Sequence, residues 1–193
     1  MRLNALDTGH SLGKKALFAL IRTVSRQPVL DIIKLVSYRP EFYGEPMKAV
    51  TQEAMRGQSS WSIGDRELMA AVVSKVNECA FCTAAHAAVA KGAYRDEAKV
   101  AAVLANIDTA PIEAPLRATL KLLRKQAQQH TVTADDMRAA LAAGATRQQI
   151  EDALAVAFAF NVTVRLADTF GFFVPGSEAM DAGAKYLLAR GYR

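Results

Sequence analysis

The chain has 193 residues, of which 51% are hydrophobic and 22% are charged, and it contains only 6 prolines and 11 glycines. This length is enough to bury the core of one domain, and an apolar, alanine-rich composition with few helix breakers favours an all-helical protein. The net charge of +5 comes from basic residues scattered among acidic ones, which argues against nucleic-acid binding, because such proteins gather Lys and Arg on one surface.

Neither a secretion signal nor a membrane span is expected. The apolar run Ala16–Ile21 is too short for the hydrophobic part of a signal peptide and is ended by Arg22. The longest apolar run, Ala153–Phe160, is far shorter than the roughly 18 residues of a membrane-spanning helix and predicts a buried helix. We therefore expect a cytoplasmic protein, and in that compartment two cysteines close in sequence are more typical of catalysis or metal binding than of a structural disulfide.

Residues 1–60 are predicted to form N-terminal helices that precede a core in residues 61–193, the two making one domain. Residues 1–12, which include His10, are expected to be loosely held. Beyond them, apolar residues spaced three and four apart indicate helices. In this first part of the chain the predicted helices cover residues 14–26, 28–39 and 46–56.

The core is also predicted to consist of helices alone. Two of them begin with capping-box patterns, Thr133 with Asp136 and Thr146 with Gln149, and Gly92 is expected to end another as its C-cap. No strand pattern is found. The predicted core helices cover residues 66–77, 79–91, 96–105, 116–130, 133–144, 148–170 and 177–189.

One stretch of the core concentrates the reactive side chains. The only two cysteines of the chain, Cys79 and Cys82, are three residues apart, and His86 follows Cys82 by four. Both thiols would lie in the first turn of the predicted helix 79–91, where unpaired amides and the helix dipole lower the pKa of a thiol. His86 would lie one turn beyond Cys82 on the same face.

A dithiol of this kind carries out redox chemistry without a bound cofactor. A thiolate attacks a peroxide oxygen to give a sulfenic acid, and the neighbouring thiol condenses with it to a disulfide. His86 is the candidate base for Cys82, and Glu67 or Glu78 would orient its imidazole.

Other interpretations of these residues stay open. A structural zinc site could use Cys79, Cys82, His86 and one carboxylate, although zinc usually draws its ligands as two separated pairs. The cysteines could also be buried and unreactive, with His86 a packed core residue.

Polar residues on the apolar helix 148–170 need partners. Arg165 and Asp168 are three apart there, and Asn161 lies on the same helix. The arginine and the aspartate are expected either to pair with each other or to line a pocket with Asn161.

The four residues Glu67, Cys79, Cys82 and His86 match a known motif. Their spacing resembles the E-x11-C-x2-C-x3-H signature of alkylhydroperoxidase D-like proteins, which belong to the carboxymuconolactone decarboxylase superfamily. The best-known form of the motif has a histidine directly before the second cysteine, where this chain has Phe81.

The resemblance is strong over residues 63–92, the helix–CxxC–helix core, and moderate over residues 111–175, which resemble the peroxidase-related branch. It implies an all-helical bundle that assembles as a homo-oligomer, a trimer or hexamer, with a dimer as a further alternative. It also implies an antioxidant thiol peroxidase that acts on a hydroperoxide substrate and is reset by an external dithiol reductant.

The resemblance assigns roles to the motif as well. Cys82 would attack the peroxide, Cys79 would resolve the sulfenic acid, and Glu67 with His86 would relay protons to and from Cys82. No metal or other cofactor is expected. The alternatives are a protein thiol–disulfide reductase with poor peroxidase activity and a metal-binding or structural helical protein. Decarboxylation is not expected, because the decarboxylase branch lacks the cysteine pair.

Overall fold

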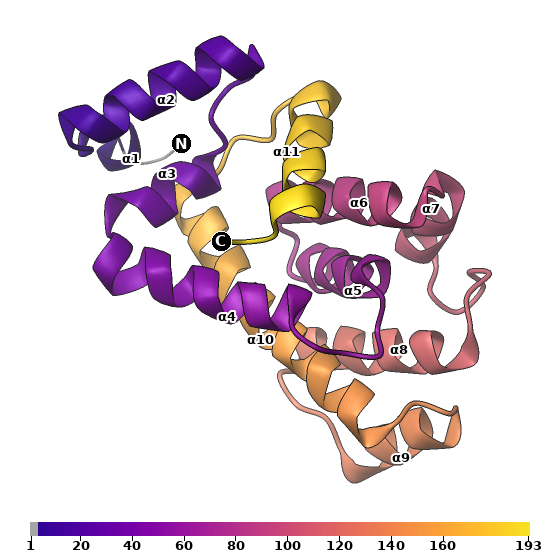
Figure 1. Ribbon diagram of the computed structural model, residues 1–193. Coiled ribbons are helices and arrows are strands. Elements are labelled where there is room, and N and C mark those ends of the chain that lie inside the picture. Colours follow the sequence, from indigo (N-terminus) through magenta and orange to yellow (C-terminus); the bar gives the residue numbers. More distant parts are fainter. Residues whose placement is uncertain (1–3) are drawn as a thin grey trace.

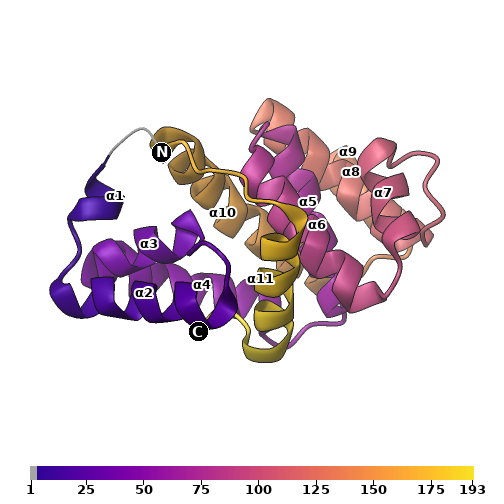
Figure 2. The ribbon, with the colours of Figure 1, turned by 90° about the horizontal axis from the view of Figure 1, so that it is seen from above.

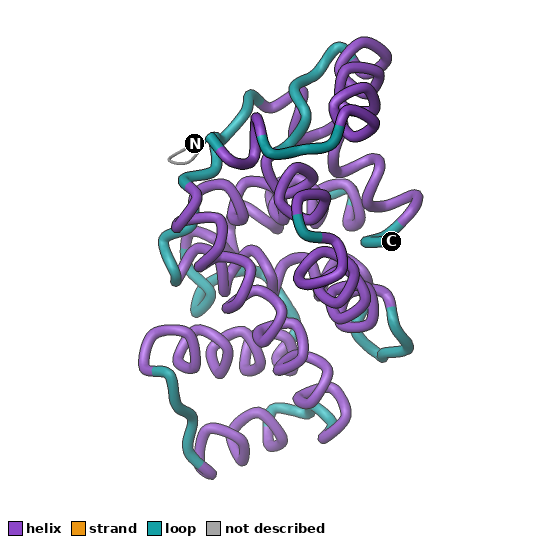
Figure 3. Tube along the Cα trace, turned by 90° about the vertical axis from the view of Figure 1, so that its left-hand side faces the viewer, coloured by secondary structure: helices purple, strands orange, loops and turns teal. Residues whose placement is uncertain are grey.

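The computed structural model describes residues 4–193, and throughout that range the regular elements are helices, which confirms the predicted all-α class (Figure 1; Figure 3). Helices of the first part of the chain are α1 (Ala5–Thr8), α2 (Leu12–Ser25), α3 (Asp31–Tyr38), the π-helix η1 (Pro40–Gly44) and α4 (Glu45–Arg56). The others are α5 (Ile63–Val76), α6 (Ala80–Tyr94), α7 (Glu97–Ala105), α8 (Ala114–Gln129), α9 (Ala134–Ala142), α10 (Arg147–Phe170) and α11 (Ser177–Arg190).

The helices α5 and α6 pack against each other at the centre of the molecule, with α11 on the far side of α6 and α10 crossing α5 (Figure 1). The helices α7, α8 and α9 lie toward one end, and α1, α2 and α3 lie at the other, as the view from above also shows (Figure 2). The helix that carries the cysteines is therefore enclosed by segments from both halves of the sequence.

Helix α5 is buried around its whole circumference, whereas its sequence predicted a single apolar face. Leu68 and Val73 are fully buried, and so are Ala70 and Ala71 between them, because α4, α6, α7, α8 and α10 all pack around this helix. The small alanines let neighbouring helices approach closely. The helix begins three residues earlier than predicted, since Ser62 caps it in a reciprocal pair with Asp65.

Helix α6 runs past Gly92, so the predicted C-cap at this glycine is wrong. The helix continues to Tyr94 and ends at Arg95, which adopts the left-handed conformation with φ 57°. A Cβ atom on Gly92 would lie 2.8 Å from Cδ1 of Leu188 on α11. The glycine therefore serves the close packing of α6 against α11 rather than the end of the helix.

The N-terminal segment is more ordered than the sequence predicted, at least in residues 4–12, since residues 1–3 lie outside the described part of the chain. Leu6 on α1 is fully buried. His10 is buried as well, with Nε2 3.0 Å from the carbonyl oxygen of Leu6 and its ring edge-on to Phe18. The predicted helix 28–39 begins later, at Asp31.

Two clusters of buried apolar residues hold the structure together. The larger one joins α4 to α10 around α5. The smaller one surrounds the cysteines and is built from distant parts of the sequence, with Cys79, Phe81 and Cys82 packed among Leu6, Leu35, Val164, Ala167, Phe172 and Met180. The N-terminal helices, the end of α10 and α11 thus close over the start of α6.

By length and composition alone, α10 is the one helix in residues 4–193 that would suffice to cross a membrane. Ala153, Val156 and Phe160 of this helix are instead buried in the larger cluster. Its apolar character is that of a central core helix, as the run Ala153–Phe160 predicts.

Candidate functional site

The two cysteines lie at the N-terminal end of α6, where the sequence predicts them. Cys79 is the N-cap residue and Cys82 is the third residue of the helix. Glu78, in the left-handed conformation with φ 58°, turns the chain between α5 and α6. Both thiols are free, and their residues are only 1% and 2% exposed.

The two thiols perturb each other. The pKa of Cys79 is lowered, chiefly because the Cys82 thiol donates a hydrogen bond to its sulfur and further because of the Cys82 backbone amide; burial opposes this shift. The pKa of Cys82 is raised, first by its role as that donor and then by burial. The nearby carboxylate of Asp168 raises both pKa values. The first negative charge of the pair therefore resides on Cys79.

Glu67 and His86 meet inside the molecule. Glu67 lies in the second turn of α5 and is fully buried, and its Oε2 is 2.7 Å from Nδ1 of His86 on α6. The antiparallel packing of α5 on α6 brings together two residues that are 19 apart in sequence. The expectation that a glutamate orients the imidazole is met geometrically by Glu67, whereas Glu78 is exposed on the surface.

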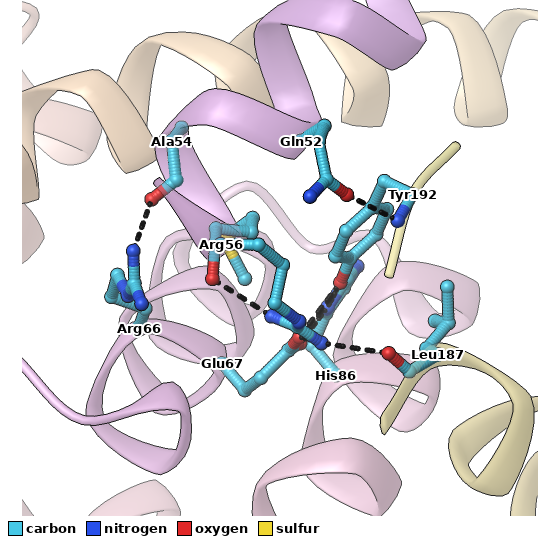
Figure 4. Close-up of polar contacts among 9 residues, drawn as sticks. Gln52, Ala54, Arg56, Arg66, Glu67, His86, Leu187 and Tyr192 are labelled. Carbon is cyan, nitrogen blue, oxygen red and sulfur yellow. Dashed lines mark hydrogen bonds and ion pairs between the residues drawn. The ribbon is translucent and has the colours of Figure 1, made fainter. Parts of the chain in front are cut away.

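Two further residues, which the sequence did not reveal, complete this cluster (Figure 4). Nη2 of Arg56 is 2.7 Å from Oε1 of Glu67, and the hydroxyl of Tyr192 lies 2.8 Å and 3.1 Å from the two carboxylate oxygens. Arg56 also donates hydrogen bonds to the carbonyl oxygens of Met55 and Leu187. The end of α4 and the segment after α11 thus both contact the carboxylate of Glu67.

This environment keeps Glu67 ionised. Burial alone would raise the pKa of Glu67, but hydrogen bonding with His86 and the charge of Arg56 outweigh it, and the net shift is downward. The pKa of Tyr192 is raised well above its usual value, first by burial and then by the charge of Glu67, so its phenol stays a donor. A buried carboxylate is stable only with such partners.

The cysteine pair at the start of α6 and the Glu67–His86 pair, which links α5 to α6, are not joined by a direct bond. No hydrogen bond between Cys82 and His86 occurs in residues 4–193, although one helical turn separates them. Nδ1 of His86 is held by Glu67, and its Nε2 has no hydrogen-bond partner in that part of the chain. The arrangement leaves Nε2 available as an acceptor for a thiol proton.

Phe81, which stands where the family motif has a histidine, takes a structural role. Its ring is buried and lies edge-on to Phe172, with centroids 5.2 Å apart. Both rings belong to the buried cluster that contains Cys79 and Cys82.

Residues 4–193 contain no group of three or more His, Cys, Asp or Glu side chains placed to hold a metal ion. Cys79, Cys82 and His86 do not form such a group, and Glu67 is already committed to Arg56, His86 and Tyr192. This geometry gives no support to the alternative of a zinc site.

Comparison with known proteins agrees with the geometry. The model of the carboxymuconolactone decarboxylase family matches residues 43–125. A solved peroxidase-related protein from Silicibacter sp. TM1040 is similar in structure, with TM-score 0.73 and 23% sequence identity, over 86% of this chain and 87% of the other. A solved alkylhydroperoxidase AhpD core protein from Ralstonia eutropha JMP134 has TM-score 0.74 and 21% identity, over 89% and 90%. Among curated proteins, none matches the chain.

Proposed function

Residues 43–125 match the model of the carboxymuconolactone decarboxylase family, and the fold is similar to that of an alkylhydroperoxidase AhpD core protein; from these likenesses we propose that the chain is an antioxidant thiol peroxidase. The observation that carries the proposal is a free Cys79/Cys82 dithiol at a helix N-terminus, one turn from an imidazole that a buried carboxylate orients. This set supplies a nucleophile, a resolving thiol and a base without a cofactor.

The first step is removal of one proton from the dithiol. Ionised Glu67 accepts the Nδ1–H of His86, which places the lone pair of the neutral ring on Nε2. That nitrogen takes a proton from the thiols, directly or through a water. The remaining negative charge is shared within the S–H···S⁻ pair and rests on Cys79.

The second step is attack on the peroxide by Cys82, the sulfur that the family resemblance implies. The proton shared by the two sulfurs shifts to Cys79, and the Cys82 thiolate attacks the terminal oxygen of ROOH. The O–O bond breaks, sulfur is oxidised to the sulfenic acid, and RO⁻ leaves as ROH with a proton from His86. The Cys79 thiol then displaces water to form the disulfide, so two thiols and ROOH give a disulfide, ROH and water.

Single-turnover chemistry tests these assignments. Reduced wild-type protein should consume one equivalent of cumene hydroperoxide and lose both thiols. Cys79→Ser should accumulate a sulfenic acid on Cys82 that dimedone traps, and Cys82→Ser should form none at a comparable rate. If Cys82→Ser consumes the peroxide as fast as wild type, the assignment of Cys82 fails.

A matched histidine pair tests the base. His86→Asn should slow peroxide consumption by about 10²-fold or more, a typical contribution of acid–base catalysis. His130→Asn is the control, because His130 is an exposed helix-end residue with φ 57°, a conformation that asparagine tolerates. Equal rates for the two variants would contradict the role of His86.

Phe81 favours a second candidate function, a protein thiol–disulfide reductase. Phenylalanine relays no proton, and the apolar Phe81–Phe172 pair packs in the same buried cluster as the two thiols. In either function an external dithiol is needed to reset the Cys79–Cys82 disulfide. A disulfide-bonded protein substrate that is reduced much faster than cumene hydroperoxide would favour the reductase.

A further inference from the structure

A cavity of about 590 Å³ opens beside the cysteine cluster, and the proposed function makes no use of it. Its wall is one face of α10, made of residues spaced three and four apart, with Gln126 of α8 and Tyr43 of η1 on the other sides. The volume lies in the range of small-molecule sites. The lining residues on α10 are Leu154, Ala157, Phe158, Asn161, Val162, Arg165 and Leu166.

Most of this wall is apolar and open to an apolar ligand. Phe158 lines the cavity and is 62% exposed, although it lies in the middle of the central helix. From Leu154 to Arg165 the face extends over about 17 Å at 1.5 Å per residue. The surface suits an elongated hydrocarbon portion laid along α10.

Two of the polar groups that line the cavity are already paired. Nδ2 of Asn161 donates to Oε1 of Gln126 at 3.0 Å, and Oδ1 of Asn161 accepts from Asn77 at 3.0 Å. These amides therefore hold α5, α8 and α10 together behind the cavity. They are committed to the structure rather than to a ligand.

Arg165 is the charged residue of the lining, and within residues 4–193 its guanidinium forms no ion pair or hydrogen bond. The pairing with Asp168 that its spacing allowed does not occur in that range. Arg165 is exposed at its position in the lining, so its guanidinium is free to bind an anionic group, and its planar donors match a carboxylate.

Tyr43 connects the cavity to the cysteines. Its side chain lines the cavity and also packs against the cluster that contains Cys79 and Cys82. Its hydroxyl is buried and has no hydrogen-bond partner in residues 4–193, and the hydroxyl of the neighbouring Thr163 donates to the carbonyl of Ala159 at 2.9 Å. Leaving a buried hydroxyl without a hydrogen-bond partner lowers the stability of the fold. We therefore expect a ligand to supply the partner of the Tyr43 hydroxyl.

The electrostatics of Tyr43 agree with a donor role. Burial is the main reason that its pKa is raised to about 12; the neighbouring Thr163 hydroxyl opposes the shift, and the nearby Cys82 adds to it. The phenol thus keeps its proton at neutral pH, and its side chain packs against the cluster that contains the sulfur proposed to attack. Developing negative charge on a peroxide oxygen is what such a donor stabilises.

We propose that this cavity binds apolar organic hydroperoxides that carry a carboxylate, with Arg165 holding the carboxylate and Tyr43 donating a hydrogen bond to the peroxide oxygen that leaves. The proposal rests on the thiol peroxidase function above and names its substrate class. The hydrocarbon part lies against Leu154, Phe158 and Val162. The same bonds form and break as in the attack by Cys82 described above. Tyr43 stabilises RO⁻ until RO⁻ takes a proton from His86.

Binding without turnover tests the site independently of the thiol chemistry. Lauric acid carries a carboxylate, whereas methyl laurate is neutral. Calorimetric titration of wild type should show lauric acid binding at least about tenfold more tightly than methyl laurate, because one charge-assisted contact contributes that much. Arg165→Gln should remove this difference. Arg147→Gln is the control, since Arg147 begins the same helix, is exposed and lies outside the cavity lining; it should keep the difference.

Kinetics tests the same site with reactive substrates. With cumene hydroperoxide and its para-carboxylate, wild type should favour the carboxylate in kcat/KM by about tenfold, and Arg165→Gln should lose that preference. Tyr43→Phe should lower kcat about tenfold or more for both peroxides and leave lauric acid binding unchanged.

The outcomes separate the two proposals. If the neutral peroxide is reduced but neither lauric acid binding nor the carboxylate preference depends on Arg165, the ligand assignment is overturned and the peroxidase function stands. Lauric acid binding that depends on Arg165, in a protein that reduces neither peroxide, supports the ligand assignment and overturns the peroxidase function. Tyr43→Phe with unchanged kcat overturns the role of Tyr43.

Discussion

Glu67 concentrates more interactions than any other residue of the site. It is fully buried and accepts from Arg56, His86 and Tyr192. Each partner comes from a different helix or from the end of the chain, so one carboxylate joins α4, α5, α6 and the segment after α11. The residue proposed to orient the base is therefore also one that holds the fold together.

The substitution Glu67→Gln should destabilise the protein by about 3 kcal/mol at pH 7, because it leaves the charge of the largely buried Arg56 side chain without a counter-ion. Tyr192→Phe removes only a neutral hydrogen-bond donor and should cost about 1 kcal/mol. Urea unfolding of both variants measures this order. Equal stability of Glu67→Gln and wild type would contradict the structural role of the ion pair.

The same comparison has a defined pH dependence. The pKa of Glu67 is lowered from its ordinary 4.5 in the folded protein, so its ionised form adds stability that is complete above that value and is lost as the pH falls through the folded-state pKa. The stability advantage of wild type over Glu67→Gln should therefore shrink below pH 4.5. Unfolding curves that keep a constant difference from pH 7 down to pH 3 would contradict this.

Among the elements, the π-helix η1 decides where Tyr43 lies, and no sequence pattern predicted it. It ends at Gly44, which passes directly over the backbone of Val36 at the end of α3. A Cβ atom on Gly44 would lie 2.9 Å from the carbonyl carbon of Val36 and closer still to its oxygen. Only glycine fits this crossing without a shift of the main chain.

Gly44→Ala should therefore destabilise the protein by about 1–3 kcal/mol, the usual cost of overpacking, since backbone atoms cannot move aside like a side chain. Gly13→Ala is the matched control: Gly13 lies in α2 with nothing within 4 Å of the new Cβ, so the change should be neutral or stabilise by up to about 1 kcal/mol. Thermal melting of both variants checks the contrast, and a loss of the same size at both positions would contradict the crossing argument.

At the scale of the whole molecule, α2 is the element with the least support from the rest of the chain. None of its residues is buried, and it lies at the edge of the molecule (Figure 2). Its exposed apolar stripe includes Leu12 at 85% and Val24 at 75% exposure, together with Leu17 and Leu20. An apolar stripe of this kind is typical of a surface that another chain covers, in line with the homo-oligomer that the family resemblance implies.

The double substitution Leu20→Glu with Val24→Glu should convert an oligomeric wild type to smaller species, with helix content unchanged by circular dichroism. Lys15→Glu, a charge change outside the apolar stripe of the same helix, should leave the assembly intact. Light scattering coupled to gel filtration measures both. A monomeric wild type would contradict the predicted homo-oligomer.

Much of the fold followed from local patterns in the sequence. Helical spacing of apolar residues predicted most helices, and the capping boxes at Thr133 and Thr146 are present in the structure. Patterns failed where a distant segment decided the local conformation. Gly92 continues its helix because α11 packs on it, and His10 is ordered because Phe18 and Tyr38 enclose it.

The sequence by itself determined which reactive side chains lie together: two thiols at a helix start, an imidazole one turn later and a glutamate on the preceding helix. All four lie within twenty residues, where helical geometry decides which side chains can come into contact. The tertiary structure alone decided the partners of Glu67 and the surroundings of the sulfurs. Arg56, Tyr192 and Tyr43 carry no local signal, because residues far apart in the sequence come together only through the packing of whole helices.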